Sequence, residues 1–282
     1  IDGETGNERF AFMPKELLSL QNTLYENSEA YKHPYGLDGQ VTTWVNDVDG
    51  DGIIESGEGD HVYLYIGMRR GGKNYYALDV TNPSIPKWLW GINGGTGDFS
   101  ELGQTWSQPK KSKVNISGMV IDVLVFAGGY DVKQDDATTR AEDTVGRAIY
   151  MVNAKTGKKV WAGGPSGFAG GFVKTFPEMK YSIPSSVLVL DMNDDGLADK
   201  MFVGDVGGQL WRFDVANGSS ANHLVTGGVV FEASGSAADS DESQNRRFYD
   251  EPDISTFRRN RIRYFSIKMG SGFRAHPLND IV

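Results

Sequence analysis

The 282-residue chain is long enough for one large all-β domain or two smaller domains, and it carries a formal net charge of −9. This acidic balance argues against nucleic acid or an anionic membrane as a partner, because both require a strongly positive protein face. Cysteine is absent, which excludes disulfides and thiolate metal sites, and no apolar run approaches the roughly 20 residues of a membrane helix.

The N-terminal part contains the one segment with helical character. The chain starts with neither Met nor a signal-like apolar stretch, so we expect it to be a piece of a longer protein. Residues 14–29 place Pro14 at a plausible first helical position, Glu16 in the first turn and several leucines partly on one face. We expect a short helix that packs against the rest of the fold.

Three hairpin-like units follow along the chain, each with an apolar strand, a glycine-containing connection and a second strand that ends in an acid or amide. They lie at residues 61–90, at 121–131 together with 146–161, and at 200–218, and their second strands end at Asp79, Asn153 and Asp214. This pattern predicts meanders of antiparallel strands. The polar segments 131–143 and 234–245 lack periodicity and are expected to be long exposed loops.

An aromatic-x-x-Pro pattern occurs four times and marks a repeat of about seventy residues. The pairs are Tyr31 and Pro34, Trp106 and Pro109, Tyr181 and Pro184, and Tyr249 and Pro252, with prolines 75, 75 and 68 residues apart. A repeated meander is the building unit of a β-propeller, whereas a β-sandwich is the alternative. We therefore predict an all-β, modified β-propeller domain over residues 1–282, with some blades outside the chain.

An acidic loop separates two apolar runs near residue 195. Oxygen-bearing side chains stand at positions 1, 3, 5 and 9 of this loop and Gly196 at position 6, which are the offsets of an EF-hand-type calcium loop. The predicted ligands are Asp191, Asn193, Asp195, the backbone carbonyl of Leu197, and Asp199. The twelfth position is Phe202, so the bidentate Glu of the EF-hand is missing.

A second acidic loop matches the same pattern upstream, between the predicted strands 40–45 and 61–67. Its predicted ligands are Asp47, Asp49, Asp51, Ile53 by its carbonyl, Glu55 and Glu58. Converging carboxylates repel one another unless a cation lies between them, and an all-oxygen donor set selects Ca²⁺ over zinc or copper. The alternative is that both segments are solvated turns, since Asp, Asn and Gly are favoured turn residues.

Catalytic machinery is not evident in the sequence. The four histidines, at 33, 61, 223 and 276, lack zinc-site spacing, and neither a G-x-S-x-G elbow nor a phosphate-binding P-loop occurs. The basic run 257–265 fits a solvated strand face, arginines paired with the acidic segment 239–242, or a site for RNA or an acidic partner.

Several segments resemble a known family. "YALDVTNPSIPKWLW", "LGQTWSQP", "IYMVNAKTGKKVW" and above all "DMNDDGLADKMFVGDVGGQLWRFD" are similar to the C-terminal β-propeller of the PilY/PilC family of type IV pilus biogenesis factors and tip adhesins. The resemblance covers most of the chain, from about residue 12 to 273, and the loop 191–199 matches the family's calcium site. The loop 47–58 rests on spacing alone.

The resemblance implies a non-enzymatic, calcium-binding protein of the bacterial surface. It would lie at the pilus tip, in the outer membrane or outside the cell after export through the periplasm, and control pilus extension and retraction, twitching motility and adhesion. Its expected partners are pilus subunits or minor pilins, or host and abiotic surfaces. Two alternatives are a quinoprotein dehydrogenase, because "VNAKTGKKVW" resembles that family's tryptophan-docking repeat, and a metal-free interaction scaffold.

Overall fold

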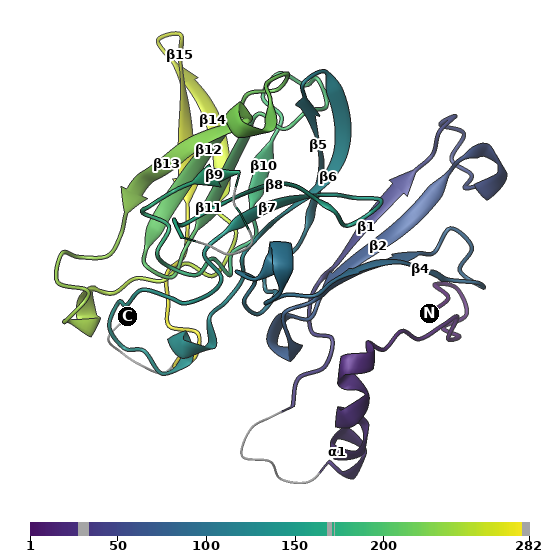
Figure 1. Ribbon diagram of the computed structural model, residues 1–282. Helices are drawn as coiled ribbons and strands as arrows, with labels where there is room; N and C mark the ends of the chain where they lie inside the picture. The colour runs from purple at the N-terminus through teal and green to yellow at the C-terminus, as the bar shows by residue number, and fades with distance from the viewer. Residues whose placement is uncertain (28–33, 168–170, 172, 278–282) are drawn as a thin grey trace.

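Four β-sheets dominate the computed structural model, which describes residues 1–27, 34–167, 171 and 173–277. Three of the sheets lie side by side in chain order, and a two-stranded hairpin follows the third (Figure 1). Each larger sheet is an antiparallel meander in which consecutive strands pair. The architecture confirms the predicted modified β-propeller with one short N-terminal helix.

The first sheet shows how the repeat makes its turns. Its strands are β1 (Val41–Asn46), β2 (His61–Gly67), β3 (Tyr75–Asp79) and β4 (Lys87–Ile92). Asp79, which ends β3, accepts hydrogen bonds from the amide and hydroxyl of Thr81, at 2.9 and 2.6 Å. This side-chain turn fixes where the chain reverses, and it explains why an acid or amide ends each predicted second strand.

The second sheet is buried on both faces. It consists of β5 (Lys110–Ile116), β6 (Met119–Ala127), β7 (Ile149–Asn153), β8 (Lys159–Gly164) and the short parallel strand β9 (Lys174–Thr175). Along β6, Val123 and Val125 pack with side chains of the third sheet, whereas Leu124 and Phe126 pack with those of the first. All four are fully buried, so the apolar run of β6 is continuous rather than alternating.

The third sheet and the hairpin end the described fold. Their strands are β10 (Leu188–Leu190), β11 (Lys200–Gly204), β12 (Gln209–Val215), β13 (Val225–Glu232), β14 (Asp253–Arg259) and β15 (Ile262–Lys268). The hairpin contacts the third sheet through Phe202 and Phe265, whose ring centroids are 5.9 Å apart. Among the described residues its arginines form no ion pair, because Asp239 of the acidic segment pairs with Arg140 instead.

The predicted N-terminal helix forms as two shorter pieces. A 3₁₀ helix, η1 (Lys15–Leu20), runs directly into α1 (Gln21–Glu26), and Pro14 flanks the first turn instead of starting it. Leu17 packs with Met68 and Tyr76, whereas Leu24 stays exposed, so little apolar contact extends the helix. Residues 28 and 29 lie outside the described part. No helix in that part is long and apolar enough to cross a membrane.

The aromatic-x-x-Pro repeat coincides with the entry into each sheet. Pro109 and Pro252 stand directly before β5 and β14, and Pro184 stands shortly before β10. The repeat aromatics Trp106, Tyr181 and Tyr249 cluster with Tyr130 and Val206, although Tyr31 lies outside the described residues. The Trp106 and Tyr130 ring centroids are 4.6 Å apart. The sequence period is therefore the spacing of segments that meet between the sheets.

The two long polar segments correct one expectation, because they are not freely exposed. In the segment 131–143, Asp131, Gln134 and Asp143 are buried, and Asp143 accepts hydrogen bonds from the Gln134 amide and from the Ser182 backbone at 2.9 and 2.7 Å. The backbone of Arg140 reaches the second segment and donates to the carbonyl of Ala238. Polarity reflected satisfied internal hydrogen bonds here rather than solvation.

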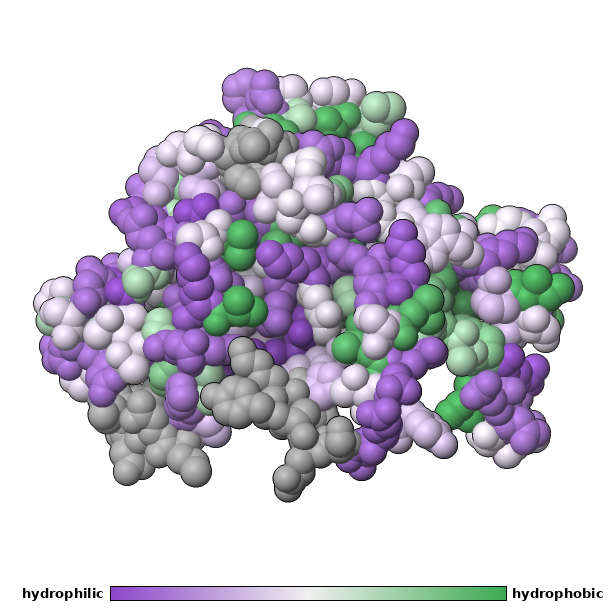
Figure 2. Space-filling model, turned by 60° about the horizontal axis from the view of Figure 1, so that its bottom comes forward, coloured by the Kyte–Doolittle hydropathy of each residue, from purple (hydrophilic) through white to green (hydrophobic). Residues whose placement is uncertain are grey.

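Short 3₁₀ turns complete the connections between strands. They are η2 (Ser56–Glu58), η3 (Arg69–Gly71), η4 (Gly97–Phe99), η5 (Val132–Asp135), η6 (Ala221–His223) and η7 (Glu242–Gln244). The face shown in Figure 2 is mostly hydrophilic and carries only scattered hydrophobic patches, as the composition predicts.

Candidate metal-binding loops

The two acidic loops occupy the same place in two different sheets. Residues 191–199, the β10–β11 loop, join the first two strands of the third sheet, and residues 47–60, the β1–β2 loop, join the first two strands of the first sheet. In the second sheet the corresponding connection is only the turn at Ser117 and Gly118, between the paired residues Ile116 and Met119. The fold thus places two candidate sites at equivalent positions.

Hydrogen bonds to side-chain oxygens shape the β10–β11 loop. Asp191 accepts from the amide of Asp194 with Oδ1 and from that of Gly196 with Oδ2, both at 2.7 Å. Asp195 accepts from the Leu197 amide at 2.8 Å, and the Asn193 side-chain amide donates to Asp195 at 3.1 Å. Gly196 has a φ of +82°, the left-handed conformation that a glycine adopts without strain.

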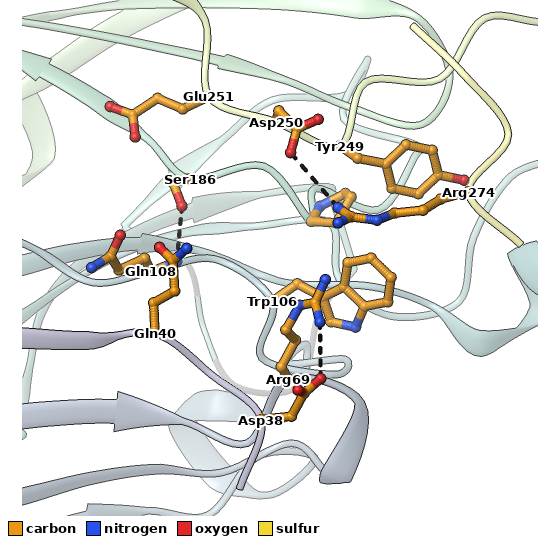
Figure 3. Close-up of a pocket in the computed structure, with 11 residues that line it drawn as sticks. Asp38, Gln40, Arg69, Trp106, Gln108, Ser186, Tyr249, Asp250, Glu251 and Arg274 are labelled. Carbon is orange, nitrogen blue, oxygen red and sulfur yellow. Dashed lines mark hydrogen bonds and ion pairs between the residues drawn. The ribbon is translucent and has the colours of Figure 1, made fainter. Parts of the chain in front are cut away.

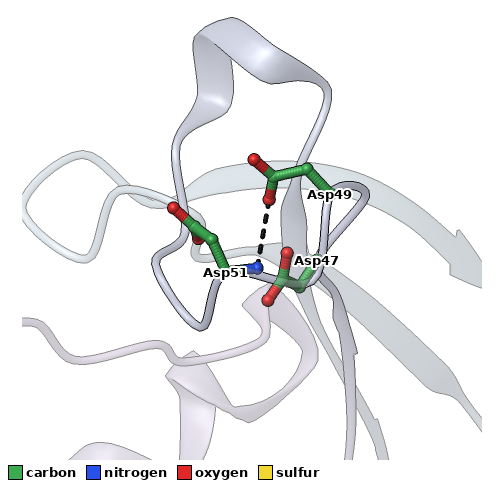
Figure 4. A group of neighbouring side chains, drawn as sticks. All are labelled: Asp47, Asp49 and Asp51. Atoms are coloured by element: carbon green, nitrogen blue, oxygen red, sulfur yellow. Dashed lines mark hydrogen bonds between the residues drawn. The ribbon is translucent and has the colours of Figure 1, made fainter.

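The β1–β2 loop repeats this hydrogen-bond pattern position by position. Asp47 accepts from the amides of Gly50 and Gly52 at 2.7 and 2.9 Å, and Asp51 accepts from that of Ile53 at 2.7 Å. The carboxylates of Asp47, Asp49 and Asp51 each offer an oxygen within 4.8 Å of the others (Figure 4). Two oxygens bound to one calcium ion at about 2.4 Å can be at most about 4.8 Å apart, so this spacing fits a shared ion.

The loops differ in the residue that closes them. In the β10–β11 loop, Asp199 accepts from the Met192 amide at 2.7 Å and stands directly before β11. In the β1–β2 loop, the equivalent amide of Val48 donates to Asp60, at 2.8 Å, and Asp60 stands directly before β2. Asp60 is only 5% exposed. By position and bonding, Asp60 is the counterpart of Asp199.

The sequence prediction missed Asp60 because it counted twelve positions from Asp47. The structure brings Asp47, Asp49 and Asp51 together, whereas Glu55 and Glu58 are exposed and, within the described part, do not join that group. Glu58 ends the short turn η2, which lengthens this loop relative to the β10–β11 loop. A signal for Asp60 was present in the sequence, since an Asp directly precedes the apolar strand after both loops.

Backbone amides favour the charged form of the first carboxylate in both loops. The hydrogen bond from Gly52, reinforced by that from Gly50, lowers the pKa of Asp47. Partial burial opposes the same effect at Asp191, but the amides led by Gly196 outweigh it and lower the pKa of Asp191. Both groups are therefore ionised at neutral pH, as a cation ligand must be.

The donor set of both loops is made of hard oxygens. Asp191, Asn193, Asp195 and Asp199 supply side-chain oxygens in one loop, and Asp47, Asp49, Asp51 and Asp60 do so in the other. The Leu197 and Ile53 carbonyls are the predicted backbone ligands. Calcium prefers six to eight such oxygens, and the exposed loop tips leave room for water to supply the remainder. The residues therefore fit Ca²⁺.

Comparisons with known proteins place these loops in a family context. A family model described as the PilY1 beta-propeller domain matches residues 1–226. The type IV pilus biogenesis factor PilY1 of Pseudomonas aeruginosa (strain UCBPP-PA14) is 30% identical over 216 residues, which make up 75% of this chain and 16% of that protein. A PilY1 homolog of Xylella fastidiosa is 30% identical over 223 residues, covering 76% of this chain and 13% of the homolog.

A solved structure shows the same fold. The chain matches the crystal structure of the Pseudomonas aeruginosa PilY1 C-terminal domain with a TM-score of 0.59 and 23% identity, over 95% of this chain and 49% of that one. The chain thus spans about half of that domain and a small part of the curated relatives.

Proposed function

The chain belongs to the PilY1 β-propeller domain family, and from that premise we propose that it acts in type IV pilus biogenesis as a calcium-binding, non-enzymatic propeller region at the bacterial surface. The curated relatives, named type IV pilus biogenesis factors, support the process. We extend the proposal to the whole chain as part of one propeller, exported through the periplasm to the pilus tip, the outer membrane or the medium.

The repeated hydrogen-bond pattern of the two loops carries the calcium proposal. In each loop, position 1 accepts from the amides of positions 4 and 6, and position 5 accepts from the amide of position 7. This pattern turns the side chains at positions 1, 3 and 5 toward one region, where their negative charges need a cation. A bound Ca²⁺ would tie the ends of β10 and β11 together, and a second ion would do the same for β1 and β2.

We propose that calcium occupancy sets the shape of these loop tips and so controls a contact with pilus subunits, minor pilins, or host and abiotic surfaces. The observation behind this step is that both loops lie at exposed strand ends rather than in the core. Control of pilus extension and retraction, twitching motility and adhesion would follow from that contact. A chain whose loops take no calcium, yet which binds the same partners, would be a metal-free scaffold instead.

Isothermal titration with Ca²⁺ tests the proposal. The wild-type chain is expected to bind two ions, and Asp195→Asn to lose the one in the β10–β11 loop, because a ligand carboxylate becomes an amide. Asp194→Asn is the matched control: its residue lies in the same loop at a non-ligand position and has a φ of +65°, which Asn tolerates. Absence of binding heat in the wild type would refute the calcium proposal, as would equal loss in both variants.

A further inference from the structure

A polar cavity of about 420 Å³ lies where the segments leading into four strands meet (Figure 3). The segments before β1, β5, β10 and β14 line it, together with residues from the β2–β3 connection and from the chain after β15. Trp106, Pro184 and Tyr249 of the aromatic-x-x-Pro repeat are among the lining residues. This volume lies within the range of about 300 to 1,000 Å³ that is usual for small-molecule sites.

The charges around this cavity are balanced. Three carboxylates line it and each is paired, Asp38 with Arg69 at 2.9 Å, Asp250 with Arg274 at 3.7 Å and Glu251 with Lys110 at 2.7 Å. A free anion would meet carboxylates already in place, and a free cation would meet guanidinium groups. The balance therefore favours an uncharged ligand over either ion.

Hydrogen-bonding capacity remains in the lining despite these pairs. A guanidinium has five N–H donors and a carboxylate can accept several hydrogen bonds, so each ion pair still offers donors beside acceptors. Figure 3 shows the arginine–aspartate pairs on either side of Trp106, with Gln40 and Gln108 nearby. The side chain of Gln40 has no hydrogen-bond partner within the part of the chain that the structure describes, so it is available to a ligand.

Trp106 holds the two arginines in place and adds apolar surface. The guanidinium carbons of Arg69 and Arg274 lie 4.9 and 5.5 Å from its ring centroid, within the range of a cation–π contact. The indole is half-buried, and Tyr249 lies beside it at 6.1 Å between ring centroids. The cavity thus combines aromatic side chains with adjacent donors and acceptors.

We propose that this cavity binds a neutral saccharide. Each sugar hydroxyl both donates and accepts a hydrogen bond, which matches an arginine beside an aspartate, while the apolar C–H face of the ring matches an aromatic side chain. The inference goes beyond the calcium proposal and does not use the acidic loops. A chain that binds sugar without calcium, or calcium without sugar, therefore separates the two.

Saturation-transfer NMR on this chain tests the assignment with D-glucose, D-galactose, D-mannose and N-acetyl-D-glucosamine. D-Glucuronate and D-glucosamine serve as the anionic and cationic comparators. At least one neutral sugar is expected to bind saturably and to change the tryptophan fluorescence. Asp250→Ala is expected to weaken this binding about tenfold, the usual effect of losing a hydrogen bond to a charged group. Gln40→Ala should weaken it less.

Asp239→Ala is the matched control, because it also removes an exposed aspartate paired with an arginine, but outside the cavity. It is expected to bind the sugar as the wild type does. The proposal is overturned if none of the four neutral sugars binds, if only a charged comparator binds, or if both cavity variants bind with unchanged affinity. Gln40→Ala keeps the test informative should the Asp250 variant fold poorly, since Gln40 supports no other side chain.

Discussion

Asp205 is a fully buried carboxylate at the turn between β11 and β12, and it makes the stability of this fold depend on pH. Its Oδ1 accepts from the amides of Gly207 and Gln209, both at 2.9 Å, and its Oδ2 accepts from the Trp211 indole at 2.8 Å. Burial raises the pKa of Asp205 to about 7, although these hydrogen bonds act in the opposite direction. The interior therefore favours the protonated acid.

The sign of the effect follows from proton linkage. The pKa of Asp205 is higher in the folded chain than its ordinary value of 3.8, so the folded state holds the proton more tightly. The contribution to stability is complete below pH 4 and is lost as the pH rises through 7. At about 1.4 kcal/mol per pKa unit, the free energy of unfolding should fall by about 2 kcal/mol between pH 5 and 7 because of this group.

Asp205→Asn isolates this contribution. The amide oxygen can keep both backbone hydrogen bonds, whereas its NH₂ group faces the Trp211 donor, so we expect a loss of about 1 to 3 kcal/mol at every pH. The pH-dependent part should disappear. Urea denaturation at pH 5 and 7 measures both quantities. The difference between the two pH values should be about 2 kcal/mol smaller in the variant than in the wild type.

Two other aspartates calibrate this measurement. Burial raises the pKa of Asp143 to about 6, so its titration adds a slope that wild type and variant share. At Asp214, hydrogen bonds from Lys200 and Arg212 outweigh burial and lower the pKa, so Asp214→Asn should leave the slope between pH 5 and 7 unchanged. An unaltered slope in Asp205→Asn would show that Asp205 is ionised inside the fold and would refute the reasoning.

Three further predictions concern packing and the calcium loops. Phe126→Ala should lower the free energy of unfolding by about 3 to 5 kcal/mol, because Phe126 is fully buried between the first two sheets, whereas Met119→Ala on the same strand, 67% exposed, should change it by less than about 0.5 kcal/mol. Urea denaturation checks both, and equal effects would contradict the packing. Asp60→Asn should remove the second calcium in isothermal titration and Glu58→Gln should not, and the reverse outcome would restore the twelve-residue count. Saturating Ca²⁺ at about 100 times its Kd should stabilise the wild type by about 2.7 kcal/mol per site, measured by thermal unfolding, and an unshifted midpoint would argue against specific binding.

The fold followed from local patterns of the sequence. Asp79 and Asn153 end strands as predicted, because their side chains bond the next turn, and the aromatic-x-x-Pro period equals the distance between sheet entries. Both signals are local, so the sequence alone could carry them. The convergence of Trp106, Tyr181 and Tyr249 in one cluster is a long-range consequence that the period implied without stating.

Other features depended on contacts between distant segments. The segment 131–143 is polar yet held by buried Asp131 and Asp143, whose partners lie elsewhere in the chain or across the loop. Asp60 replaced Glu55 and Glu58 at the β1–β2 loop because the inserted turn η2 moves those glutamates away from Asp47. Spacing rules assume a loop of fixed length, so the insertion defeated the count.

Anomalous diffraction from crystals grown with Ca²⁺ tests the central claim most directly. The account predicts a calcium peak in the β10–β11 loop, about 2.3 to 2.6 Å from oxygens of Asp191, Asn193, Asp195 and Asp199. A second peak is expected beside Asp47, Asp49, Asp51 and Asp60. A well-ordered β10–β11 loop with no peak, its carboxylates hydrated and turned apart, would contradict the claim.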